Sequence, residues 1–329
     1  MNQRHSVTAV DTAAHTGPTG PSGLNGPIGP TGQSTPFQAK TEIGHYENFP
    51  VASLLCPPAL RAPIAAIYHF ARTADDIADE GTDDAQTRLH TLQTYREQLQ
   101  LAADHASTQN TALLPPSLSP YLPKWAPVFG PLQIAIQQYQ LPVQLLADLL
   151  DAFQQDIVMT RDGAFYADHA ALLDYCRRSA NPVGRLLLHL YGISDSISLA
   201  DSDSICSALQ LINFWQDPSV DIPRGRHYFT NEACARHGVS RAMLAALRNT
   251  PQTREMLREC CAQARAMLLG GAPLVHRIPG RAGWELRLVV QGGLCILDKL
   301  AQNHYDALER RPVLRKRDYV RLIWKTLWM

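Results

Sequence analysis

The chain has 329 residues, of which 45% are hydrophobic and 18% charged, and its formal net charge at pH 7 is zero. This composition is typical of a soluble globular protein with a sizeable core. The balance of 30 basic and 30 acidic residues argues against a nucleic-acid partner, which requires excess positive charge. Seven dispersed cysteines without a CxxC pair predict reduced thiols in a cytoplasmic protein.

The N-terminal region, residues 1–41, differs from the rest of the chain. In "GPTGPSGLNGPIGPTG", glycine recurs at every third position from Gly17 to Gly32, which is the pattern of collagen. A trimerising stalk is one interpretation of this repeat. The repeat is short and has no proline in its third positions, so a disordered leader is favoured. Residues 42–329 are then expected to form a single domain.

From about residue 41 onward, apolar residues recur at helical spacing, without the alternation that is typical of strands. Pro63 suits the first helical position of a segment that continues to about residue 80. A proline-rich stretch at 105–130 predicts a surface loop. The sequence thus predicts an all-α domain of eight or more helices, the others lying at about 84–104, 131–140, 142–160, 168–192, 201–217, 251–269, 280–304 and 316–327.

A first group of polar residues lies in "IAAIYHFARTADDIADE". On an α-helix, residues spaced i, i+4, i+7 and i+11 share one face. That spacing is shared by Tyr68, Arg72, Asp75 and Asp79. One face therefore presents an aromatic ring, a guanidinium and two carboxylates one turn apart. The apolar residues beside them indicate that this face looks into the protein.

A second group lies far downstream, in "QLINFWQDPSVDIPRGRHYF". Residues spaced i, i+3, i+7 and i+11 are here Gln210, Asn213, Asp217 and Asp221. Pro218 removes a helical hydrogen bond and predicts a kink just after Asp217. A single DxxxD pair is common on solvated helices, whereas two pairs with matched polar partners indicate a functional site.

Four carboxylates that face one cavity need cations to offset their charge. Aspartate and asparagine oxygens suit Mg²⁺, which often binds through substrate phosphates. Arg72 and Arg226 add positive charge for the same anion. The pattern predicts a diphosphate held between two magnesium-loaded clusters, whose departure would leave a carbocation. Such a cation needs a dry pocket with aromatic walls, for which the candidates are Phe49, Tyr68, Tyr175 and Tyr228.

Four blocks of the sequence, "HYENFPVA", "AIYHFARTADDIADE", "YCRRSANPVGRLLLHLYG" and "QLINFWQDPSVDIPRGRHYF", stand in the order and spacing of one family. From about residue 42 to 329 the chain resembles the squalene and phytoene synthases, which implies the isoprenoid-synthase fold, a helical bundle around a central cavity. The resemblance implies that several Mg²⁺ ions are bound by Asp75, Asp79, Asn213, Asp217 and Asp221. It implies that the diphosphate lies near His45, Arg72, Gln210 and Arg226. It places Phe49, Tyr68, Tyr175, Val183, Gly184 and Tyr228 along the prenyl channel.

Within the family, "NPVGR", "NFWQD" and "WELRLVVQGGLCILDKL" look like the bacterial hydroxysqualene synthase branch. Val220 and Gln216 stand where many head-to-head prenyl synthases have an acidic residue and an arginine. The branch converts presqualene diphosphate and water to hydroxysqualene and diphosphate in squalene and hopanoid biosynthesis, and no NADPH is expected. Tyr175 is expected to stabilise the cation or orient the water. The alternative is a synthase that condenses two prenyl diphosphates head to head, giving presqualene diphosphate or a phytoene-type product.

Other interpretations come from different classes of protein. Glu42 and His45 form one ExxH, but a di-iron bundle needs two such motifs on helices. A non-catalytic adaptor with a collagen-like stalk would require the aspartates to be solvated. The basic tail "RRPVLRKRDYVRLIWKTLWM" predicts either peripheral contact with the inner membrane surface or a last helix packed on the core. The family resemblance also implies handover of substrate from other enzymes of the squalene pathway.

Overall fold

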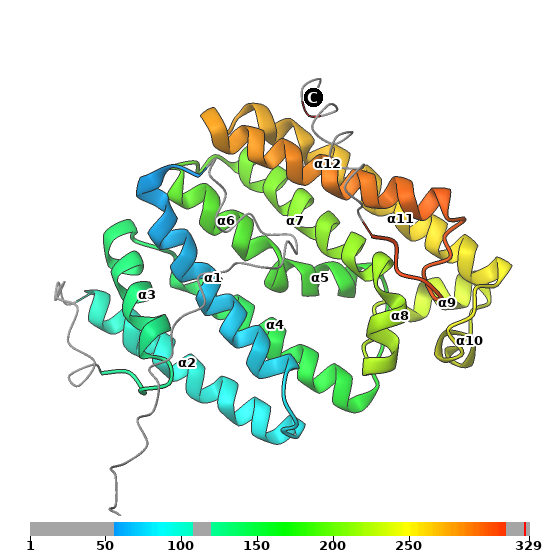
Figure 1. Cartoon of the computed structure of the whole chain (residues 1–329), viewed down its shortest axis with the longest axis horizontal. Helices are drawn as coiled ribbons and strands as arrows, with labels where there is room; N and C mark the ends of the chain where they lie inside the picture. The colour runs from blue at the N-terminus through cyan, green and yellow to red at the C-terminus, as the bar shows by residue number, and fades with distance from the viewer. Residues whose placement is uncertain (1–55, 108–119, 314–325, 327–329) are drawn as a thin grey trace, which may run out of the picture. The chain divides into compact units, whose positions relative to one another are not determined.

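The computed structural model describes residues 56–107, 120–313 and 326 (Figure 1). The chain divides into two units, Met1–Ile43 and Gly44–Met329, and all of the described residues belong to the second unit. The leader, His45, Phe49 and most of the basic tail (314–325 and 327–329) lie outside the described residues. The expectations placed on them therefore remain predictions.

The described residues form helices and no strands, which confirms the all-α prediction. The α-helices are α1 (Pro58–Asp79), α2 (Ala85–Ser107), α3 (Ala126–Tyr139), α4 (Val143–Asp162), α5 (His169–Ser179), α6 (Asn181–Leu190), α7 (Ser196–Gln216), α8 (Pro218–Asp221), α9 (Asn231–His237), α10 (Arg241–Ala245), α11 (Pro251–Gly271) and α12 (Gly280–Gln302). Two short 3₁₀ helices cover Ile222–Arg224 and Ala272–His276. No helix among the described residues is long and apolar enough to cross a membrane.

The start of α1 differs from the expectation that Pro63 occupies the first helical position. The helix begins at Pro58, and Pro63 lies inside it as a buried residue. Proline is favoured at the first position because its missing N–H would have no helical partner there. Pro58 takes that position, and the helix tolerates the one hydrogen bond that Pro63 cannot donate.

The helix expected over residues 168–192 is two helices, α5 and α6, which are separated by Ala180. Asp168 starts α5, since its side chain accepts a hydrogen bond of 2.8 Å from the Ala171 backbone N–H. The chain turns at Ala180 because Pro182, in the first turn of α6, cannot donate to a preceding carbonyl. This break lets α6 pack against α4, α5 and α7 together.

Two groups of buried apolar side chains hold the helices together. One group joins α1, α2, α3 and α4, and the other joins α5, α7, α11 and α12, which Figure 1 shows side by side. In the first group Phe70 stacks on Tyr95, Phe129 packs against both rings, and all three side chains are fully buried. Burial of one large apolar side chain stabilises a fold by about 1.5–3 kcal/mol. Because α4 packs against α1, α5 and α6, it connects the two groups.

Candidate active site

The first acidic pair lies in the last two turns of α1. Arg72 Nη1 donates to Asp75 Oδ2 at 3.0 Å, and its other amino group contacts Asp76 and Glu80 at 2.7 and 2.9 Å. Burial and the neighbouring Asp79 raise the pKa of Asp75 to about 7. The last turn of α1 contains no basic residue, although the C-terminal end of a helix is electrostatically negative. Arg72, one turn earlier on the same helix, therefore offsets only part of the charge of these carboxylates, and the rest must be offset from other segments or by bound cations.

The second acidic pair lies where α7 ends. As Pro218 predicts, α7 stops at Gln216, and Asp217 is its C-terminal cap while Asp221 ends the single turn of α8. The Asp221 N–H donates to the Asp217 carbonyl at 2.9 Å, so the two residues stay one turn apart. Burial and the charge of Asp217 raise the pKa of Asp221 to about 7.

Arg226 connects the two acidic pairs. Its guanidinium forms an ion pair with Asp79, and its backbone N–H donates to the Asp221 carbonyl at 3.0 Å. Burial alone would lower the pKa of Arg226, but the contact with Asp79 raises it overall. The fold thus brings the end of α1 beside the segment that follows α8. Of the predicted residues, Asp75, Asp79, Asp221 and Arg226 form one electrostatically coupled group.

A cluster of aromatic rings lies beside this group. Tyr228 stacks on Phe214 with 3.6 Å between ring centroids, and the Tyr175 ring lies 6.3 Å from Tyr228. Tyr166 adds a fourth ring, 5.6 Å from Tyr175. The predicted Tyr175 and Tyr228 therefore come together in one aromatic wall. Tyr68 lies on α1, one turn before Arg72, and its ring contacts the edge of His69.

Asp156 on α4 is a site residue that the sequence analysis missed. The Tyr175 hydroxyl donates to Asp156 Oδ2 at 2.5 Å, and burial raises the pKa of Asp156 to about 7. The charges of Arg226, Asp79 and Asp75 also act on Asp156. The only signal in the sequence was a single carboxylate in the helical stretch "AFQQDIVM". Nothing in that stretch predicts its contact with Tyr175.

Arg311 was also missed. It forms a two-pronged ion pair with Asp217, with Nη2 at 2.9 Å from Oδ2 and Nε at 2.5 Å from Oδ1. The Gln216 side chain donates to the Pro312 carbonyl at 2.7 Å and so holds the segment that carries Arg311. A guanidinium thus reaches Asp217 from a distant segment, although position 216 itself is not an arginine.

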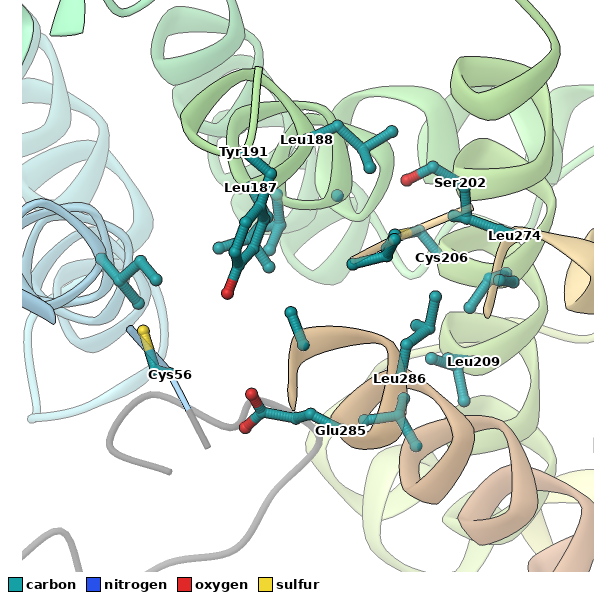
Figure 2. Close-up of a pocket in the computed structure, with 17 residues that line it drawn as sticks. Cys56, Leu187, Leu188, Tyr191, Ser202, Cys206, Leu209, Leu274, Glu285 and Leu286 are labelled. Carbon is teal, nitrogen blue, oxygen red and sulfur yellow. The ribbon is translucent and has the colours of Figure 1, made fainter. Parts of the chain in front are cut away.

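The predicted channel residues Val183 and Gly184 line an apolar pocket between α6, α7 and α12 (Figure 2). Most of its wall consists of aliphatic side chains, among them Leu187, Leu209 and Leu286. Gly184 lets α6 approach α7 closely, because a Cβ there would lie 2.6 Å from the Cys206 sulfur. Gln210 and Asn213, both partly exposed, lie on α7 between this pocket and Asp217.

The acidic residues can bind magnesium only together with other ligands, such as water or a substrate phosphate. Among the described residues, no three His, Cys, Asp or Glu side chains converge so as to hold one metal ion. The acidic pairs can therefore supply only part of a coordination sphere. Mg²⁺ commonly keeps several waters and binds through one or two carboxylates plus substrate phosphates. Carboxylates whose pKa is raised by burial and by a neighbouring carboxylate fit this arrangement, since a cation would offset both effects.

The sequence matches known proteins over most of its length. The squalene/phytoene synthase family model matches residues 44–318. The chain is 32% identical over 272 residues to a hydroxysqualene synthase of Sinorhizobium fredii, covering 82% of each protein. It is 24% identical over 296 residues to a presqualene diphosphate synthase of Zymomonas mobilis, covering 90% of this chain and 93% of that protein.

A solved structure of a squalene synthase from Alicyclobacillus acidocaldarius is similar as well. It is 32% identical and superimposes with a TM-score of 0.67, covering 79% of this chain and 90% of that one. The family match covers most of the chain and includes every described residue of the site. The chain belongs to the squalene/phytoene synthase family.

Proposed function

We propose that the protein is a hydroxysqualene synthase, which converts presqualene diphosphate and water to hydroxysqualene and diphosphate. The observation that carries the choice within the family is that a relative of that name is 32% identical over 82% of this chain. The matching presqualene diphosphate and phytoene synthases are 24–27% identical where they cover most of the chain, and they reach 29–32% only over 55–56% of it. The geometry supports the underlying chemistry, because two acidic pairs and three arginines lie beside an aromatic wall.

In this proposal the diphosphate binds at the junction of α1, α7 and α8. Asp75 and Asp79 would hold magnesium on one side, and Asp217, Asp221 and Asn213 would hold it on the other. The bound metal would stabilise the charge that develops on the leaving diphosphate. Arg226 contributes a fixed positive charge between the pairs, and Arg72 and Arg311 add charge from either side.

After the C–O bond to the diphosphate breaks, the cation that remains needs protection until it rearranges. The faces of Tyr175, Tyr228 and Phe214 attract positive charge and exclude bulk water. Burial raises the pKa of Tyr175 well above that of a free phenol, so Tyr175 stays protonated and donates to Asp156. Water then forms the new C–O bond, and we assign the released proton to the Asp156 carboxylate. No NADPH is required, because water rather than hydride consumes the cation.

The test is incubation of the purified full-length protein with Mg²⁺ and without NADPH. One sample receives presqualene diphosphate and another only farnesyl diphosphate, and hexane extracts are read by mass spectrometry. A C30 alcohol from the first sample and no product from the second are expected. Conversion of farnesyl diphosphate would instead assign the protein to the condensing branch of the family.

Binding to liposomes of inner-membrane lipids would test the membrane contact predicted for the tail.

A further inference from the structure

The apolar pocket has a polar group on one wall. Glu285 on α12 lines it and is only 9% exposed, so its carboxyl is buried among aliphatic side chains. Figure 2 shows Glu285 and Tyr191 facing the same opening, with Cys56 at its edge. The Tyr191 hydroxyl is hydrogen-bonded with the Cys56 thiol. Ser202 and Cys206 lie on the far wall, so Glu285 is the only charged side chain among the described residues of this pocket.

Glu285 lies at the end of the pocket that is remote from the acidic pairs. Ile64 precedes Asp75 by eleven residues on α1, and Cys206 precedes Asp217 by eleven residues along α7, so each lies about 16 Å from its aspartate. Both Ile64 and Cys206 line the pocket. Glu285 lies near the start of α12, and Gly293, eight residues later on α12, lies beside Leu209 and Ile212 of α7, so Glu285 lies farther from Asp217 than Cys206 does. The separation is of the order of one extended farnesyl chain.

We infer that Glu285 limits the length of the prenyl chain that this pocket accepts. The inference rests on the proposed function, since it assigns the pocket to a chain of the diphosphate substrate. A hydrocarbon chain that stops short of Glu285 leaves the remaining exposed part of its carboxyl facing the opening of the pocket. A chain that is longer by one isoprene unit must cover the carboxyl with apolar groups, and removing a polar group from water in this way is costly. An apolar residue of similar size would carry no such penalty.

The test compares the binding of two ligands that cannot ionise. Farnesyl and geranylgeranyl thiolodiphosphate are titrated with Mg²⁺ into the full-length protein by calorimetry, and the ratio of the two Kd values is taken. We expect wild type to bind the shorter chain at least about tenfold more tightly. Glu285→Leu should reduce this ratio roughly tenfold while the Kd for the farnesyl ligand changes less than about twofold. Glu285→Gln, which keeps a polar group of the same size, is the matched control and should retain the preference.

The outcomes separate this inference from the proposed function. An unchanged ratio in Glu285→Leu, or no binding of either ligand to wild type, overturns the inference. Turnover of presqualene diphosphate by wild type is measured in parallel. A ratio that shifts as expected without formation of a C30 alcohol supports the inference and rejects the proposed function. If thermal melting shows that Glu285→Leu does not fold, Glu285→Met provides an unbranched apolar side chain for the same comparison.

Discussion

At the scale of single residues, the contact between Tyr175 and Asp156 is the most informative. The hydroxyl donates to the carboxylate at 2.5 Å, in surroundings where burial favours the protonated form of both groups. Other titratable groups that interact with Asp156 are Tyr166, Tyr228, Cys176, Arg226 and the first acidic pair. A carboxyl with a pKa near 7 can exchange a proton at neutral pH, which suits the role proposed for it.

The raised pKa of Asp156 predicts a dependence of stability on pH. Because its folded pKa of about 7 exceeds the ordinary value of 3.8, the folded state holds the proton more tightly than the unfolded state. Asp156 therefore contributes stability that is complete below about pH 4 and is lost as the pH rises to about 7. In metal-free wild type, the unfolding free energy is expected to fall as the pH rises from about 5 to about 8. In Asp156→Asn this fall should be smaller than in wild type by about 2–4 kcal/mol.

Urea unfolding of both proteins at the two pH values checks this expectation. Asp148→Asn, on the same helix, is the control, since Asp148 accepts a hydrogen bond of 2.8 Å from Gln144 at the surface. It should leave the pH dependence of wild type unchanged. If the unfolding free energies of Asp156→Asn and wild type depend equally on pH, then ionisation of Asp156 in the folded protein costs little free energy.

At the scale of elements, α1 and α7 both have acidic residues at their C-terminal ends. For α1 these negative charges reduce the stability of the helix. Four carboxylates stand at the negative end of α1, and its last turn has no basic residue. Ion pairs with Arg72 and Arg226 offset part of this unfavourable charge, and bound cations would offset the rest. The close packing of α6 on α7 is the second constraint, since it forms one wall of the apolar pocket.

Asp75→Asn is expected to separate stability from activity. The substitution removes a partly buried carboxylate that Asp79 repels, so the melting temperature of the metal-free protein should rise by several degrees. Turnover with Mg²⁺ should fall by about a hundredfold or more, because a ligand for the cation is lost. Asp83→Asn, at an exposed position beyond the helix, should change neither quantity. A fall in melting temperature for Asp75→Asn would contradict the repulsion argument.

Gly184→Ala is expected to destabilise the contact between α6 and α7. The added methyl group would lie 2.6 Å from the Cys206 sulfur, and the Ser202 hydroxyl is closer still. Overpacking of this kind costs about 1–3 kcal/mol of unfolding free energy. Gly292→Ala on α12 is the control, because a Cβ added at Gly292 would meet no atom within 4 Å. Denaturant unfolding should find that variant equal to or slightly more stable than wild type.

At the scale of the whole molecule, the site is assembled from helices at both ends of the described chain. The segment after α12 is anchored by Arg254, whose Nε lies 2.5 Å from Asp306 Oδ1, and by Gln216 at the Pro312 carbonyl. These contacts position the segment so that Arg311 forms its ion pair with Asp217. Asp217 therefore has its ion pair with Arg311 only when the segment after α12 is folded against α7 and α11, whereas Asp221 also receives the charge of Arg226.

Arg311→Gln tests this assembly. Removal of the guanidinium should weaken binding of inorganic diphosphate with Mg²⁺ by roughly tenfold, since one charge-assisted contact is lost. The far-UV circular dichroism should not change, because the pair lies at the surface of the site. Arg310→Gln, at the neighbouring exposed residue, is the control. Equal affinities in the two variants would show that Arg311 only holds Asp217 in place.

Local patterns in the chain were enough to establish the class of fold and most of the acidic group. Helical periodicity is a local property, so residues spaced along one helix, such as Asp75 and Asp79, can be placed on a shared face without knowledge of any other segment. Pro218 likewise predicted a break in the helix from its chemistry alone, as a kink after Asp217, and the structure ends α7 one residue earlier, at Gln216. The family resemblance drawn from four short blocks is confirmed by the match over residues 44–318.

The long-range contacts of the site, by contrast, arise only from the packing of the folded chain. Arg226 pairs with Asp79, Arg311 with Asp217 and Tyr175 with Asp156, and in each pair the partners are well separated in the chain. These contacts depend on how helices pack, which is set by side-chain shapes summed over whole interfaces rather than by spacing within one segment. The same packing enclosed Glu285 in an apolar pocket, although its sequence neighbours give no sign that it is buried.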